Sequence, residues 1–113
     1  MANTFKIDTK SSVSNSGTSN TNATVVSAGG SATLVILSIL IANKTAASAQ
    51  ADVFINKNSG DDVFLVKNAP IPGGSSLEII SGSKIIMESS DVLQITSNTA
   101  SALDAAVSYL EQT

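Results

Sequence analysis

Residues 33–43 read TLVILSILIAN, the longest nearly continuous apolar stretch of the chain. Successive side chains of a strand point to opposite faces. One face would carry Leu34, Ile36, Ser38, Leu40 and Ala42, and the other Val35, Leu37, Ile39 and Ile41. Both faces are apolar and rich in β-branched residues, so the stretch predicts a strand covered on both sides, by the core or by a partner subunit. A buried helix is the alternative.

Two similar segments follow this stretch, DVFINK at 52–57 and DVFLVK at 62–67. The short loop between them, NSGD at 58–61, contains a glycine that can adopt a positive φ. The pair predicts a β-hairpin, with Phe54 and Phe64 on the same face.

Further short apolar segments recur roughly every 8 to 12 residues with turn residues between them, as in sandwiches and barrels. They lie at 25–26, 76–80, 84–88 and 92–97. Residues 101–113 fit either an alternating strand or a helix with an apolar stripe, and a strand is favoured because it would complete a sheet. We therefore expect an all-β chain, with an antiparallel β-sandwich of the Ig-like or jelly-roll-like kind over residues 25–113.

The N-terminal region has a different composition. Residues 9–24 read TKSSVSNSGTSNTNAT, which buries too little apolar area to offset its own ordering entropy. Residues 1–24 are therefore expected to form either a flexible tail or an extended arm that orders against a neighbouring subunit. Phe5 and Ile7, which alternate ahead of the polar stretch, would anchor the arm as a short strand.

Composition excludes several classes of function. The chain has no Cys and no His, which excludes zinc fingers, iron–sulfur clusters and Cys/His nucleophile–base pairs. All 6 basic residues are Lys and the net charge is −3, which disfavours nucleic-acid binding. The apolar run at 34–42 has 9 residues, well below the roughly 20 that a membrane-spanning helix needs. Asp61 and Asp62 fit a solvated turn better than a calcium site.

From these absences we expect no enzyme activity, no metal or cofactor, and neither nucleic acid nor membrane as a partner. Charged residues make up 13% of the chain, against about 25% in an average soluble protein. Weak self-repulsion of this kind favours a subunit that associates with others.

Six phrases of the sequence carry a family resemblance. They are ILIAN at 39–43, ADVFI at 51–55, VKNAPIPGGSSLE at 66–78, KIIME at 84–88, SDVLQ at 90–94 and ALDAAVSYLE at 102–111. On these phrases the chain resembles a family of small virion structural proteins of tailed bacteriophages, common in cyanophages and their marine relatives. The phrases are structural and contain no catalytic signature.

The resemblance implies a β-sandwich that builds a virion. The expected function is that of a capsid cement or decoration protein on the capsid surface, bound to the major capsid protein or other virion proteins as a homo-oligomer, with a trimer favoured. A tail, neck or baseplate component is the alternative. A host-surface carbohydrate-binding module is less favoured, because the chain has few aromatic residues and no Trp.

The expected contacts between subunits, or with the coat, come from the arm and from one face of the apolar stretch. The candidate residues are Phe5, Ile7, Val35, Leu37, Ile39 and Ile41. If that face is core instead, association would use other strands.

Overall fold

The computed structural model describes residues 3–11, 14–15, 24–58, 60–80, 84–99 and 102–113, and these residues contain strands and no helix. The strands, in chain order, are β1 (Asn3–Lys10), β2 (Ser14–Asn15), β3 (Thr24–Ser27), β4 (Thr33–Asn43), β5 (Ala49–Asn56), β6 (Val63–Ile71), β7 (Ser76–Glu78), β8 (Ile85–Met87), β9 (Val92–Ser97) and β10 (Leu103–Gln112). Strand formation over 103–112 confirms the strand interpretation of the C-terminal segment.

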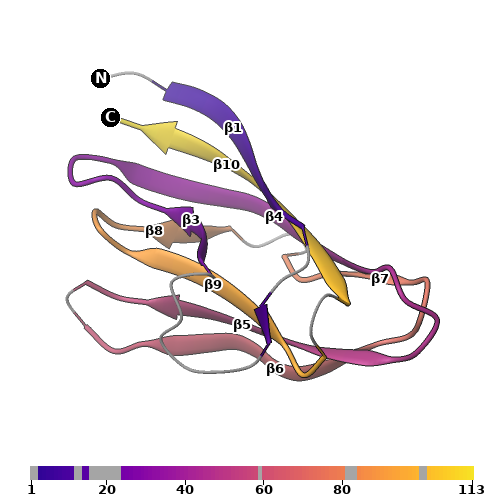
Figure 1. Cartoon of the computed structure of the whole chain (residues 1–113). Coiled ribbons are helices and arrows are strands. Elements are labelled where there is room, and N and C mark those ends of the chain that lie inside the picture. The colour runs from indigo at the N-terminus through magenta and orange to yellow at the C-terminus, as the bar shows by residue number, and fades with distance from the viewer. Residues whose placement is uncertain (1–2, 12–13, 16–23, 59, 81–83, 100–101) are drawn as a thin grey trace.

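Two sheets pack face to face (Figure 1). Sheet A has the order β1-β10-β4-β7, and β8 also pairs with β4. Sheet B has the order β2-β9-β5-β6, and β3 also pairs with β9. The pairings are antiparallel except that of the two-residue β2, which runs parallel to β9. The antiparallel β-sandwich expected from the sequence is confirmed.

The core lies between the sheets and is built almost entirely from aliphatic side chains. In β5 and in most of β10, buried residues alternate with more exposed ones, as one covered face requires. The largest fully buried side chains are Val26, Leu34, Ile36, Ile39, Ile41, Val53, Ile71, Met87, Leu93, Ile95 and Leu103. Each contributes about 1.5–3 kcal/mol relative to leaving it exposed, so this layer supplies the main drive for folding.

A β-bulge divides β4. Leu37 is an extra residue between the pairs that Ile36 and Ser38 make with β10, and an extra residue shifts the alternation by one position. The inward residues on the two sides of the bulge are Leu34, Ile36, Ile39 and Ile41. The prediction of two strictly alternating faces is therefore wrong, because the bulge brings residues of both expected faces to the core side.

The predicted hairpin is confirmed as β5 and β6. Phe54 lies opposite Phe64, with ring centroids 5.3 Å apart. β6 is the outer strand of sheet B, and its pairing with β5 has two register shifts. Asn68 adopts a positive φ of 55°, and its N–H donates to the Asp52 carboxylate at 2.6 Å. Pro70, which has no N–H, also lies in β6, so this edge is irregular.

A buried asparagine closes one end of the sandwich. The Asn43 amide nitrogen donates to the backbone oxygens of Ala47 at 2.8 Å and Ile71 at 2.9 Å. Its amide oxygen accepts from the N–H of Thr45 at 2.9 Å and from the Thr45 hydroxyl at 2.7 Å. The chain packs closely here, since a Cβ on Gly73 would lie 2.3 Å from a backbone oxygen of the β4–β5 connection. These contacts tie the end of β4 in sheet A to the end of β6 in sheet B.

A buried carboxylate organises the loops near the β8–β9 turn. Asp91 is 1% exposed. It accepts from the Lys57 ammonium at 2.6 Å, and from the backbone N–H groups of Asn58 at 3.0 Å and Glu88 at 2.9 Å. Burial by itself raises the pKa of Asp91, but these hydrogen bonds together lower the pKa below its usual value. The same ion pair links the β5–β6 loop to the β8–β9 turn.

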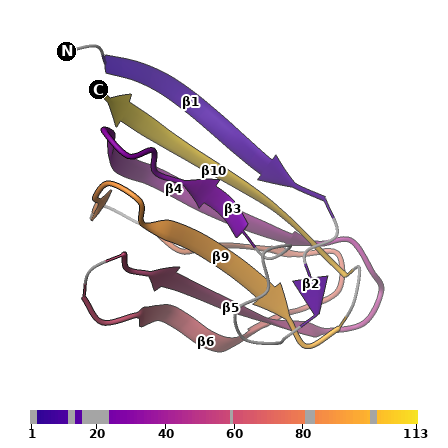
Figure 2. The same cartoon turned by 60° about the vertical axis from the view of Figure 1, so that its left-hand side comes forward.

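The first strand belongs to the sheet of its own chain. β1 pairs with β10 over its whole length, from Asn3 opposite Gln112 to Lys10 opposite Ala105, without a register shift. Figure 2 shows β1 alongside β10 at the outer edge of sheet A. The expected boundary at residue 24 therefore does not separate this segment from the sandwich. Most of the polar stretch at 9–24 lies outside the described residues.

Candidate functional site

The outer face of sheet A, turned away from sheet B, is apolar across four strands. A row of side chains crosses it, each directly opposite the next: Phe5 in β1, Leu110 in β10, Val35 in β4 and Ile86 in β8. Phe5 is 77% exposed and Ile86 is 57% exposed. Side chains directly opposite in antiparallel strands contact one another, so the four form a continuous strip, called here the apolar row.

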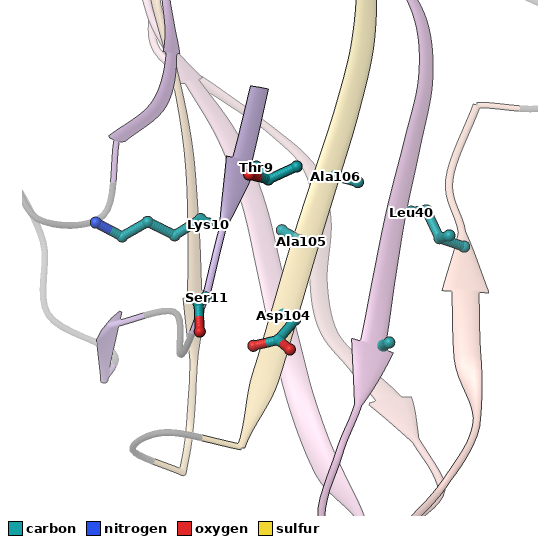
Figure 3. A pocket seen from close by; sticks show the side chains of 8 residues that line it. Thr9, Lys10, Ser11, Leu40, Asp104, Ala105 and Ala106 are labelled. Atoms are coloured by element: carbon teal, nitrogen blue, oxygen red, sulfur yellow. The ribbon is translucent and has the colours of Figure 1, made fainter. Parts of the chain in front are cut away.

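Small residues leave a hollow on β1, β10 and β4, four residues along β10 from Leu110 of the apolar row. It has a volume of about 280 Å³, and its lining includes Thr9, Leu40, Ala42, Ala105 and Ala106. In Figure 3, Thr9 and Leu40 lie on opposite sides of β10, and the Lys10 side chain extends away. Asp104 at the hollow pairs with Lys44 at 3.0 Å. The surface that lines the hollow is mostly apolar, so the hollow fits an apolar side chain of another protein better than it fits a charged ligand.

β1 turns its charged residues to the inner side of the sheet and its apolar residues outward. Lys6 lies 2.7 Å from the carboxylate of Glu111, which raises the pKa of Lys6. The Tyr109 hydroxyl donates to the Asp8 carboxylate at 3.0 Å. Burial and this hydrogen bond raise the pKa of Tyr109 to about 12. These contacts fix the orientation of β1, so its aromatic and aliphatic side chains face the surroundings.

The outer face of sheet B is polar by comparison. The Asn56 amide donates to the Gln94 side-chain oxygen at 2.7 Å, and the Gln94 amide donates to the Thr24 hydroxyl at 3.1 Å. Among the described residues, the exposed large apolar side chains divide unevenly. Sheet A carries Phe5, Ile7, Leu40 and Ile86 on its outer face, and β6 of sheet B carries Val63 and Phe64. Exposed apolar surface therefore concentrates on sheet A.

The residues expected from the sequence to make contacts fall into three groups. Phe5 is 77% and Ile7 59% exposed, while Val35 and Leu37 are half-buried in β4. Ile39 and Ile41 are fully buried in the core. The expectation is therefore corrected for these last two, because the bulge turns them inward. The structure brings Phe5 and Val35 together in the apolar row.

Sequence reasoning missed three members of this surface, Leu110, Ile86 and Leu40. Alternation along 103–112 places Leu110 on the outward face, so part of the signal was present in the sequence. The missing information is which strands are neighbours, because Leu110 and Ile86 join the row only through the register of β10 and β8 with β4.

Other chemistry-bearing groups are used within the fold. Lys57 bonds to Asp91, and Lys67 lies 4.7 Å from the centre of the Phe64 ring. The Asp62 carboxylate accepts from the backbone N–H of Lys57 at 2.8 Å. Within the described ranges, no group of three or more metal-ligating side chains occurs, and no buried side-chain nitrogen or oxygen lacks a hydrogen-bond partner.

The part of the chain that the structure describes contains no helix long and apolar enough to cross a membrane.

No protein-family model matches the chain, and no curated protein sequence matches it. What the protein does is therefore inferred from its outer face and from the phrases of its sequence.

Proposed function

We propose that this protein is a structural subunit of a tailed-bacteriophage virion, a cement or decoration protein that binds the coat lattice through the outer face of sheet A. The observation that carries the proposal is the apolar row, a strip of side chains across four strands on a face that the chain itself leaves uncovered. The family resemblance of the sequence phrases supports the virion as the setting. Ile86 and Leu110 lie within two of those phrases.

The physical properties of this face suit a cement protein. A cement subunit gains affinity from several modest contacts made at once on a repeating lattice. Covering an exposed large apolar side chain stabilises a complex by up to about 1.5–3 kcal/mol. The charged fraction of 13% leaves little repulsion to oppose close packing on a coat protein.

The proposed role is structural and involves no catalysis. Three buried polar side chains, Asn43, Asp91 and Gln94, each take part in hydrogen bonds that connect strands or turns. Perturbed groups at active sites are usually aimed into a cleft, whereas Asp91 is satisfied by its own loops. The major capsid protein is the proposed partner, with copies of this chain associating on the capsid surface.

Binding to phage heads that lack this protein tests the contact surface. The double variant Phe5→Ser, Ile86→Ser removes both ends of the apolar row, and Val63→Ser on β6 is a matched control because Val63 is also exposed and apolar. We expect the double variant to bind at least about tenfold more weakly, which corresponds to about 1.4 kcal/mol. The control should bind like wild type. Equal binding by the double variant would refute the proposed surface.

Cryo-electron microscopy of the intact virion tests the location. Density for this sandwich on the outer capsid lattice would support the cement role. Density confined to the neck, tail or baseplate would replace it with the tail-assembly alternative.

A further inference from the structure

The sheet edges of the described chain differ in how well they resist pairing with another strand. β6 has two register shifts and a proline. The edge of sheet A beyond β4 is divided between β7 and β8, of three residues each. The edge of sheet B beyond β9 consists of β2 and β3, of two and four residues. Short, interrupted or bulged edges of these kinds discourage pairing.

β1 has none of these protections. It is eight residues long, pairs with β10 without a register shift, and contains neither Pro nor Gly. Among the described residues, β10 is its only strand partner, and no other described strand pairs with its outer edge. Its lysine at position 6 is engaged by Glu111 of the same chain. A long, regular edge with exposed Phe5 and Ile7 is a template for strand addition.

We propose that two copies of this chain pair antiparallel through their β1 strands, about a two-fold axis at Ile7. In this register Ile7 lies opposite Ile7 of the second copy on the outer face. Each Lys6 lies opposite Asp8 of the other copy on the inner face. Sheet A then continues across the dimer, and the two apolar rows lie on one extended surface.

Charge excludes the two adjacent registers, and the axis at Ile7 also pairs more of β1 than an axis at Thr9, which would place Asp8 opposite Lys10. Moving the axis by one residue toward the N-terminus places Lys6 opposite Lys6, and moving it by one toward the C-terminus places Asp8 opposite Asp8. Like charges directly opposite in paired strands are destabilising, whereas opposite charges stabilise. The existing contacts persist, because an ammonium has three donors and a carboxylate has several acceptor positions. Lys6 can therefore keep Glu111, and Asp8 can keep Tyr109.

A second copy fits this edge better than a closed ring does. A self-complementary strand satisfies a two-fold axis, in which the same patch meets itself. A ring, including the trimer that the family resemblance favours, would need β1 to pair with a different surface. The opposite edge of sheet A is divided between two three-residue strands and offers no matching length. The pairing of copies does not depend on the proposed virion role, so the two are tested separately.

Single cysteines in the full chain test the register directly, because the natural chain has no Cys. Cα atoms directly opposite in antiparallel strands are about 4.5–5.5 Å apart, within the roughly 4.4–6.8 Å that a disulfide bridges. We expect Ile7→Cys to form a covalent dimer under mild oxidation. Thr9→Cys is the matched control on the same face. Two such residues would lie four positions apart along the paired strands, about 13 Å, and should not cross-link.

An equimolar mixture of Phe5→Cys and Thr9→Cys should give a mixed covalent dimer, since these positions lie opposite in the proposed register. Absence of an Ile7→Cys dimer, or equal cross-linking of Thr9→Cys alone, would overturn the proposal.

Sedimentation equilibrium tests the pairing without cysteines. Wild type should sediment as a dimer. Ile7→Lys places two like charges opposite each other at the axis, and should raise the dimer dissociation constant at least about tenfold. Because Ile7 is 59% exposed, the variant should keep its circular dichroism spectrum. A wild type that sediments as a monomer or a trimer, or an Ile7→Lys variant that dimerises like wild type, would refute the pairing.

Discussion

The two sheets end in outer strands of similar length, but the exposed apolar residues of these strands differ in their contacts. β1 has eight residues and β6 has nine, and each exposes two large apolar side chains. In β6, the exposed Phe64 packs against Phe54 and lies beneath the Lys67 ammonium. In β1, Phe5 is 77% exposed on a regular strand.

This difference distinguishes a protected sheet edge, β6, from an edge that is available to a partner, β1. β6 carries its own protection in its sequence, namely a proline, a residue with positive φ and a lysine over an aromatic ring. β1 has no proline, no residue with positive φ and no register shift. Its Lys6 and Asp8 side chains are held by Glu111 and Tyr109 of the same chain. Whether an exposed apolar strand is available to a partner therefore depends on how regular its edge is and on which contacts its side chains make within the chain.

The largest expected effect separates the inner and outer faces of sheet A within β4. Ile41→Ala removes a fully buried side chain and should lower the free energy of unfolding by about 2–5 kcal/mol. Leu40→Ala, on the adjacent and 43% exposed side chain, should cost well under half as much. Chemical denaturation of both variants measures the contrast. Equal losses would contradict the position of the bulge.

That bulge marks the limit of what the sequence predicts. The strands at 33–43 and 103–112 were predicted because alternation and β-branched residues are local signals. The extra residue Leu37 is defined only by the pairing of β4 with β10, a segment far along the chain. Local alternation therefore assigned Ile39 and Ile41 to the wrong face.

The candidate surface was predicted in part for the same reason. The alternation of Phe5 and Ile7 indicated a strand with an apolar side, and the structure places that side outward. The row from Phe5 to Ile86 is assembled from four strands that are not consecutive in the chain. No local pattern reports which strands become neighbours, because that depends on the packing of the whole sandwich.

The buried carboxylate near sheet B should give the next largest effect. Asp91→Asn removes the charge that Lys57 contacts and replaces one accepting oxygen with a donor, so we expect a loss of about 1–3 kcal/mol at neutral pH. Asp61→Asn in the nearby hairpin loop is the control, because Asp61 is exposed. Urea denaturation of the two variants measures the difference.

The pH dependence of this effect follows from the lowered pKa of Asp91. A carboxyl with a lowered native pKa stabilises the fold above its unfolded pKa of about 3.9 and loses that contribution as pH falls through the native value. The gap between wild type and Asp91→Asn should therefore narrow below about pH 4. A gap that stays constant into strong acid would show that the charge of Asp91 is not what stabilises the loops.

A smaller effect is expected at the irregular edge. Asn68 has φ of 55°, a conformation that costs a β-branched residue about 1–2 kcal/mol. Asn68→Val should therefore lower the melting temperature and disturb the register shift of β6 near Asn68, while Asn68→Gly should preserve both. If Asn68→Val also makes the protein associate through β6, the backbone irregularity at Asn68 is what prevents this edge from pairing with another chain. Unchanged stability and association in Asn68→Val would remove the physical basis for contrasting β6 with β1.

The smallest effect concerns the fastening of β1. Tyr109→Phe removes the hydroxyl that donates to Asp8 and should cost about 1 kcal/mol at neutral pH. The pKa of Tyr109 is raised to about 12, from about 10 in an unfolded chain. A raised pKa stabilises the fold fully below the unfolded value and less as pH rises through the native one. Wild type should therefore lose stability between about pH 10 and 12 more steeply than Tyr109→Phe.

Lysines that titrate in the same range are common to both proteins, so the difference in stability between them reports on Tyr109 alone. The chain has a single Tyr, and its phenolate absorbance reports the native pKa independently. An ordinary titration near pH 10 would mean that β1 is not held against β10 by this bond.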